Sequence, residues 1–73
     1  MNITYDQDVD AVYLSLKSNL PNNEVDKTYC CDVNEIGGII NLDFDKEGRL
    51  LGVEILGAKD KLPKEFMEHL AKL

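Results

Sequence analysis

The chain has 73 residues, of which 14 are acidic and 8 are basic, and its formal net charge is −6. This length allows one small domain over residues 1–73, and a hydrophobic fraction of 44% is typical of a folded chain rather than a disordered one. The acidic balance excludes nucleic acids and anionic membranes as partners, because both require clustered cations, and it leaves divalent cations, basic proteins and further copies of the chain.

The first half of the chain predicts three β-strands, because apolar and polar residues alternate there with a period of two. We expect these strands over residues 2–5, 11–17 and 25–33. The aspartate-rich segment 6–10 predicts a turn between the first two strands, and the segment 18–24, with its proline and asparagines, predicts a loop before the third.

The second half predicts two more strands and a helix. Residues 39–44 and 49–56 keep the period of two and are joined by the turn DKEG, while a turn at 34–38 precedes them. Beyond the segment GAKDK the period becomes helical, and Pro63 suits a first helical position, so we expect a closing helix of about three turns. The apolar residues at this helical spacing are Leu62, Phe66, Leu70 and Leu73.

These elements predict an α+β fold, an antiparallel sheet of about five strands in a meander with one C-terminal amphipathic helix packed on one face. One helix covers one face only, so apolar residues on the second face need another partner, and the sheet edges need protection as well. We therefore predict a homodimer formed through the second face or a sheet edge. Ala11 lies on that face, and the interaction candidates there are Tyr13, Ile39, Leu50, Glu54 and Leu56.

Two segments resemble a known protein family. YDQDVDAVYLSL near the start and LDFDKEGRLLGVEIL near the end resemble the opening and closing motifs of domain of unknown function 2283, a family of short prokaryotic proteins. The resemblance covers about residues 5–56 and implies a small protein without an established activity, of the kind that includes antitoxin-like partners of small toxins. The matching residues are Tyr5, Asp6, Asp10, Ala11, Tyr13, Asp43, Asp45, Gly48, Gly52, Glu54 and Ile55, and the chain departs from the pattern at Val12, Val53 and its adjacent cysteines.

The segment DFDKEGRLLGVE, residues 43–54, has the spelling of a calcium-binding EF-hand loop, with carboxylates at alternate positions, then glycine, and a glutamate at the end. Both flanks alternate with a period of two, so the segment instead predicts a β-hairpin with Gly48 at a positive-φ position of the turn. In such a hairpin Glu54 lies about 16 Å from the turn, whereas calcium ligands converge to ~2.5 Å from one ion.

A weak divalent-cation site in the acidic turns is the first alternative function. Its candidate ligands are Asp6, Asp8, Asp10, Asp43, Asp45 and Glu47. The first three residues lack the glycine and glutamate that follow in a calcium loop, so they predict a hairpin connection whose carboxylates accept backbone N–H bonds. The two acidic turns are expected at opposite ends of the sheet, so they could share an ion only across a dimer.

The hairpin also fixes which residues share a face. The expected register opposes Leu42 to Leu51, which gathers the large apolar residues on one face and places Glu54 on the other. Glu54 is the strongest candidate for catalysis, because it lies in mid-strand between Val53 and Ile55. A small hydrolase using Glu54 is the second alternative function, although a general base also needs a pocket and a second group.

The remaining reactive residues predict no site. His69 is the lone histidine and lies at the border of the helical stripe, and Cys30 and Cys31 are adjacent strand residues that point to opposite faces. No phosphate loop, nucleophile elbow or dinucleotide fingerprint occurs, so we predict no cofactor and no enzyme activity. The opening MNITYDQDVD lacks the basic start and apolar core of a signal peptide, and no run reaches the ~20 apolar residues that span a bilayer, so we expect a cytoplasmic protein.

The sequence therefore predicts a non-enzymatic, self-associating protein-interaction module, with a second copy or a basic protein as its partner.

Overall fold

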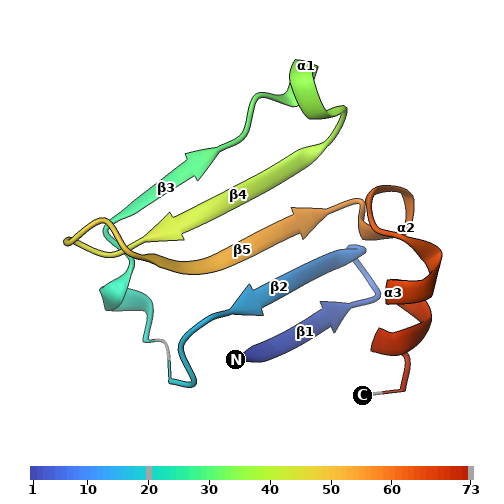
Figure 1. Cartoon of the computed structure of the whole chain (residues 1–73), viewed down its shortest axis with the longest axis horizontal. Coiled ribbons are helices and arrows are strands. Elements are labelled where there is room, and N and C mark those ends of the chain that lie inside the picture. Colours follow the sequence, from blue (N-terminus) through green and yellow to red (C-terminus); the bar gives the residue numbers. More distant parts are fainter. Residues whose placement is uncertain (20, 73) are drawn as a thin grey trace.

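The computed structural model describes residues 1–19 and 21–72, and Leu20 and Leu73 lie outside the described residues. Five strands, three short α-helices and one 3-10 helix follow one another within the described part of the chain (Figure 1). In chain order they are β1 (Asn2–Asp6), β2 (Ala11–Ser15), the 3-10 helix η1 (Asn22–Glu24), β3 (Lys27–Cys30), α1 (Val33–Ile36), β4 (Ile39–Phe44), β5 (Leu50–Leu56), α2 (Ala58–Lys61) and α3 (Lys64–Leu70).

The strands form one antiparallel sheet in the order β1-β2-β5-β4-β3 (Figure 1), which confirms the α+β class and the five antiparallel strands. The consecutive order of a meander is wrong, because β5 lies between β2 and β4 and the chain crosses from β2 to the far edge before β3. The sequence of β5, LLGVEIL, explains its place, since the strand richest in aliphatic residues is the one that gains most from two neighbours.

The segments around the third strand differ from the prediction. β3 ends at Cys30, because the carboxylate of Asp32 accepts the N–H of Asn34 at 2.9 Å and caps α1, where a turn was expected. Helix α1 ends at Gly37, whose φ of 66° is the left-handed conformation that favours glycine.

The single closing helix of about three turns is also wrong in extent. Two short helices take its place: α2 forms from the predicted connection, and α3 has seven residues. Pro63 separates them, because it lacks an N–H and forces Leu62 into an extended conformation with φ −100° and ψ 151°. Of the predicted stripe, Leu70 is buried and Phe66 is half-buried, and Leu73 lies outside the described residues. None of the described helices is long and apolar enough to cross a membrane.

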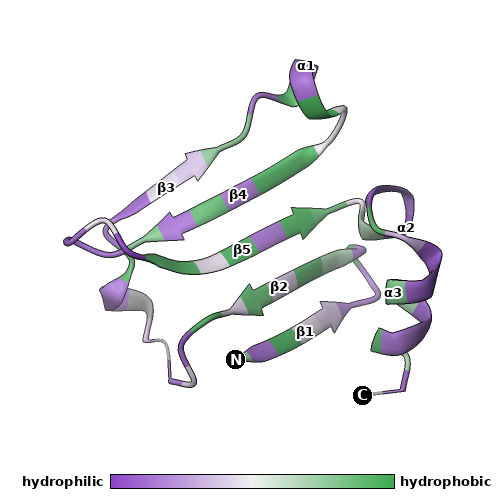
Figure 2. Cartoon of the chain, in the orientation of Figure 1, coloured by the Kyte–Doolittle hydropathy of each residue, from purple (hydrophilic) through white to green (hydrophobic). Residues whose placement is uncertain are grey.

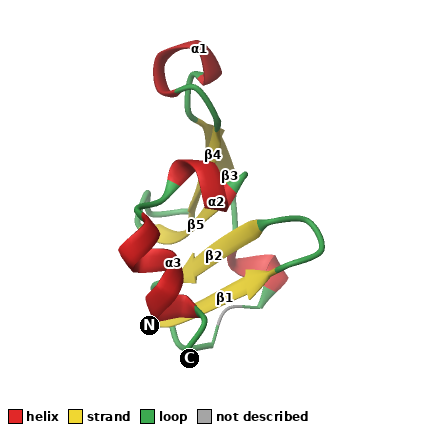
Figure 3. Cartoon of the chain, turned by 90° about the vertical axis from the view of Figure 1, so that its right-hand side faces the viewer, coloured by secondary structure: helices red, strands yellow, loops and turns green. Residues whose placement is uncertain are grey.

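The strand register sorts the sheet residues into two faces, because directly paired residues share a face. Tyr5, Val12, Ile55 and Ile40 are paired in succession and form one row across the sheet, on what we call the helix side. Figure 3 shows α2 and α3 lying together on one side of β1 and β2. The core forms where these helices meet the row: it consists of buried Val12, Ile55, Ala58 and Leu70, with Ile3, Tyr5, Ile40, Val53, Leu62, Phe66 and Met67 packed around them.

Candidate functional site

The face opposite the helices, which we call the open face, carries a network of polar side chains from four strands. The hydroxyl of Tyr13 on β2 donates to Asp43 Oδ2 at 2.8 Å, and the hydroxyl of Thr28 on β3 donates to Asp43 Oδ1 at 2.7 Å. Beside them the amide of Asn41 on β4 donates to Glu54 Oε1 on β5 at 2.9 Å. Both oxygens of Asp43 therefore accept hydrogen bonds from its neighbours, and the network ties β2, β5, β4 and β3 together.

The side chain of Tyr13 passes over Gly52 to reach Asp43. Gly52 on β5 pairs with Asp43 on one side and with Ser15 on the other. Tyr13 itself pairs with Glu54, the next residue of β5 on the same face. A Cβ atom added at Gly52 would overlap the hydroxyl of Tyr13, lie 2.5 Å from Tyr13 Cζ and lie 3.0 Å from the carbonyl oxygen of Leu14. The glycine is thus required by the close approach of a side chain, which is a usual reason for glycine inside a strand.

The environment of Tyr13 keeps its hydroxyl protonated. Burial, the hydrogen bond to Asp43 and the charges of Asp43 and Glu54 together raise the pKa of Tyr13 to about 12. At neutral pH Tyr13 is therefore a hydrogen-bond donor rather than a base or a nucleophile. The arrangement serves to hold strands in register.

We expect Tyr13→Phe to lower the free energy of unfolding by about 1 kcal/mol at neutral pH, the usual contribution of one hydrogen bond. Because the pKa of Tyr13 is raised on folding to about 12, its stabilisation is complete below the unfolded pKa of 10.0 and is lost as the pH rises toward 12. The difference in stability between wild type and variant should therefore shrink above pH 10, as measured by urea unfolding. A difference that stays constant through this range would contradict the assignment.

The turn between β1 and β2 is fastened to α2 by Asp10. Asp10 adopts a left-handed conformation with φ 54°, and its carboxylate accepts the hydroxyl of Tyr5 at 2.7 Å and the N–H of Lys59 at 3.2 Å. The carbonyl of Asp10 also accepts the N–H of Ala58 at 3.0 Å. The hydrogen bond to Asp10 is the main cause that raises the pKa of Tyr5 above its usual value. Asp10 thus serves as an internal acceptor that positions α2.

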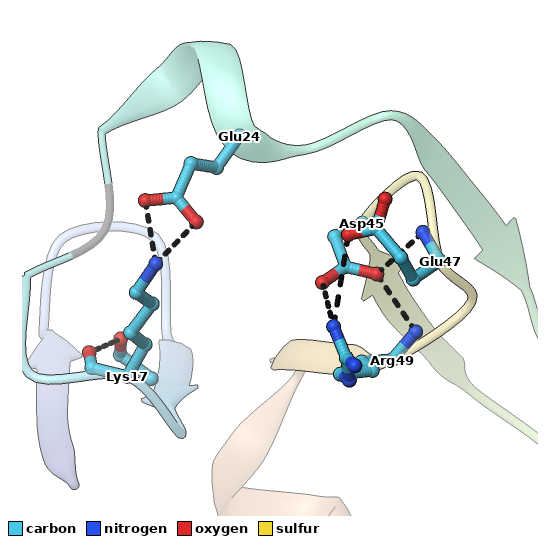
Figure 4. A network of polar contacts seen from close by, with 6 residues as sticks. Lys17, Glu24, Asp45, Glu47 and Arg49 are labelled. Atoms are coloured by element: carbon cyan, nitrogen blue, oxygen red, sulfur yellow. Dashed lines mark hydrogen bonds and ion pairs between the residues drawn. The ribbon is translucent and has the colours of Figure 1, made fainter.

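The turn between β4 and β5 is organised in the same way (Figure 4). Asp45 Oδ1 accepts the N–H groups of Glu47 and Arg49, each at 2.9 Å, and Gly48 has the positive φ of 81° that the sequence predicted. Arg49 lies 3.6 Å from Glu47 and 4.0 Å from Asp45, but this guanidinium is 75% exposed, so these ion pairs contribute little. Figure 4 also shows Lys17 bonded to both oxygens of Glu24, at 2.6 and 2.8 Å.

Five of the six acidic residues singled out as metal candidates have carboxylates with other partners, and Asp8 is the sixth. In the β1–β2 turn, Asp6 accepts the N–H of Asp8 at 3.0 Å. Asp43 belongs to the open-face network, and Ala11 and Leu56 pair at the end of the sheet opposite the β4–β5 turn, so the two acidic turns lie at opposite ends. In the part of the chain that the structure describes, no group of three or more His, Cys, Asp or Glu side chains is placed to hold a metal ion.

Four of the predicted contact residues share the open face in two adjacent rows, in which Tyr13 pairs with Glu54 and Ile39 pairs with Leu56, and Leu50 is the exception. Ile39 is 40% exposed and pairs with half-buried Leu56 on the open face, at the end near the helices. Glu54 lies in the polar network and lines an open hollow with Tyr13 and the β1–β2 turn. Leu50, which was expected on the second face, is displaced by a β-bulge and pairs with Phe44, a residue of the apolar set.

The hairpin register also differs from the prediction. The connection over residues 45–49 and the bulge each shift the register by one residue, so Leu42 pairs with Val53 rather than with Leu51. Side chains at 39–43 and 52–56 keep their predicted face although their partners change, whereas Leu50 does not. His69 is exposed near the end of α3, and Cys30 and Cys31 are free thiols, exposed and half-buried respectively.

Sequence reasoning missed the two tyrosine–aspartate pairs, Tyr13–Asp43 and Tyr5–Asp10. The signal for the first pair was Gly52 inside an otherwise aliphatic strand. Five of the eleven residues that carry the family resemblance belong to these pairs or to the close approach between them: Tyr5 and Asp10 at the first turn, and Tyr13, Asp43 and Gly52 in the network. The motif therefore describes in part how this sheet is held together.

Comparison with known proteins identifies a family for this chain. Neither the curated proteins nor the solved structures contain a match to the chain. The family described as protein of unknown function (DUF2283) matches it over residues 2–59, a span that includes all five strands and both acidic turns. The chain therefore belongs to the DUF2283 family.

Proposed function

We propose that this protein is a small, non-enzymatic, self-associating protein-interaction module. The observation that carries the proposal is its incomplete burial. The chain exposes 5413 Å², whereas a compact monomer of 8.2 kDa exposes about 4,500 Å². Its radius of gyration is 12.7 Å, against about 11 Å for a compact domain of this length. The excess surface, roughly 900 Å², is close to the ~800 Å² that each partner buries in a standard interface.

The small core supports self-association. Among the described residues, the buried hydrophobic side chains are Val12, Leu51, Ile55, Ala58 and Leu70, and the chain has no disulfide to add stability. Domains of this size that lack disulfides or metals often gain stability by oligomerising.

The chemistry of the open face supports binding rather than catalysis. Asp43 accepts two hydrogen bonds, Glu54 accepts one from Asn41, and Tyr13 stays protonated at neutral pH. These groups satisfy one another, although Tyr13 and Glu54 also line the open hollow beside the β1–β2 turn. The net charge of −6 further supports a basic protein as the partner of the assembled module, because opposite charge speeds and orients association.

We expect sedimentation equilibrium to give a mass of twice 8.2 kDa at micromolar concentrations, with reversible dissociation on dilution. The physical reason is that a second copy removes exposed apolar side chains from water. A folded monomer at about 500 µM, where even an interface with a Kd of 50 µM is mostly occupied, would overturn the proposal. Circular dichroism on the same samples verifies that the chain is folded.

A further inference from the structure

The helix side of the sheet carries more apolar surface than the helices cover. Beyond the row that packs against α2 and α3, two further rows run across the strands. The second row follows the pairing Ile3, Leu14, Val53, Leu42 and Tyr29. In the third row Phe44 pairs with Leu50 and with Lys27. Leu16 lies at the other end of this row beside buried Leu51, to whose carbonyl its N–H bonds at 2.8 Å. Figure 2 shows hydrophobic stretches at the start of β5 and on the arrowhead of β2, at the end of the sheet away from the helices.

The exposure of these rows contrasts with that of the core. Leu16 is 45% exposed, Tyr29 is 56% exposed and Leu50 is 38% exposed, whereas Val12 in the first row is fully buried. We call Leu16, Tyr29, Leu42, Phe44 and Leu50 the uncovered surface. Leu42 and Phe44 are half-buried and connect its more exposed members.

Three described residues of the crossover between β2 and β3 lie against the other face of the sheet. Ser18, Pro21 and Val25 line a hollow on the open face together with Tyr13 and Asp43. The helices cover one end of the helix side, and these three residues cover part of the open face.

From this arrangement we propose that a second copy of the chain docks on the uncovered surface, so that two sheets pack face to face on their helix sides. This inference rests on the proposed function and names its interface. The missing burial of roughly 900 Å² matches what a stable dimer takes from each copy. A two-fold axis brings the same surface of both copies together, and each copy then covers what the other leaves exposed.

The usual spacing between packed layers is compatible with a second copy of the sheet on this surface. Packed sheets lie about 10 Å apart, which equals the diameter of a helix with its side chains, so the partner's sheet can continue the layer that α2 and α3 begin. The polar open face is a poorer site for the same contact, because docking there would desolvate Asp43 and Glu54. The two copies also repel one another through their charges of −6, so the contact must be apolar.

The test measures the dimer Kd by sedimentation for wild type and for Leu16→Lys and Tyr29→Lys. Both substitutions lower the net negative charge, so weaker association cannot result from added repulsion. Each places a charge in the interface twice, once per copy, and we expect the Kd to rise by at least about 100-fold. The matched controls are Val9→Lys and Ile39→Lys, whose side chains are 63% and 40% exposed and lie outside the uncovered surface. We expect the Kd of both controls to stay within about threefold of wild type, as for other surface changes.

The dependence of the wild-type Kd on salt and a replacement variant complete the test. The wild-type Kd should fall as NaCl is raised, because salt screens the repulsion between acidic copies, and a Kd that rises with salt would overturn an apolar interface. If a lysine variant loses its circular dichroism, Tyr29→Thr replaces it, since threonine suits a strand and still removes the ring. A monomeric wild type rejects the proposed function itself. A dimer that survives both lysine variants, or that is lost only in Ile39→Lys, rejects this interface and leaves self-association standing.

Discussion

Gly52→Ala is expected to lower the free energy of unfolding by about 2 kcal/mol, the middle of the range for overpacking a filled site. The new Cβ would overlap the ring of Tyr13, with Tyr13 Cζ at 2.5 Å, and would press on the carbonyl oxygen of Leu14 at 3.0 Å. To relieve the overlap, Tyr13 must swing away and give up its hydrogen bond to Asp43. Thermal unfolding at fixed protein concentration should show a loss of roughly 8–16 °C, from the usual relation for domains of this size.

The double variant Tyr13→Val, Gly52→Ala isolates the cause. Without the ring, alanine no longer meets its main obstacle, and replacing a strand glycine then gains up to about 1 kcal/mol by reducing the entropy of the unfolded chain. The cost of the alanine should therefore fall to about zero or change sign relative to Tyr13→Val alone. An equal cost in both backgrounds would show that Tyr13 is not the reason for the glycine.

Asp10→Ala is expected to destabilise the fold by about 2 kcal/mol, because it combines two losses. Alanine tolerates the φ of 54° poorly, and it removes the carboxylate that accepts the N–H of Lys59 and the hydroxyl of Tyr5. Asp10→Asn keeps an acceptor and a good left-handed residue, whereas Asp10→Gly relieves the backbone and loses the acceptor. Urea unfolding should rank the stabilities as wild type, asparagine, glycine and alanine in descending order.

A matched control comes from the same turn. Asp8 is exposed and supplies its backbone N–H to Asp6, so Asp8→Ala should change the stability by less than about 0.5 kcal/mol. Equal stabilities for the alanine and asparagine variants of Asp10 would show that neither the acceptor nor the conformation matters there.

Local patterns predicted the parts of the fold that depend on near neighbours. The period of two placed the strands around Val12 and Ile55, and the acidic turn placed Gly48 at a positive φ. The same period assigned Asn41 and Glu54 to one face correctly although the register was wrong by two residues, because a shift of two preserves the alternation. The helix boundaries failed where Pro63 divides the closing segment, since a short helix depends on packing more than on propensity.

The strand order could not be predicted from the sequence, and the polar network that depends on this order could not be predicted either. Tyr13 and Asp43 are 30 residues apart and meet only because β5 lies between β2 and β4. Thr28 reaches the same carboxylate because it pairs directly with Asp43 between β3 and β4. Without the strand order, acidic residues at alternate positions suggest ion ligands, whereas the structure uses them as acceptors for tyrosine, threonine and backbone donors.

The central place of β5 also governs how the sheet is assembled during synthesis. The hairpin of β1 and β2 and the pair of β3 and β4 share no direct strand contact, and β5 is the strand that joins them. The two halves of the sheet can therefore pair only after β5 is available, when Val53 pairs with Leu14. Until residues 50–56 leave the ribosome, the nascent chain holds two separate hairpins, each with an unpaired strand edge, and such edges are what chaperones and neighbouring nascent chains recognise.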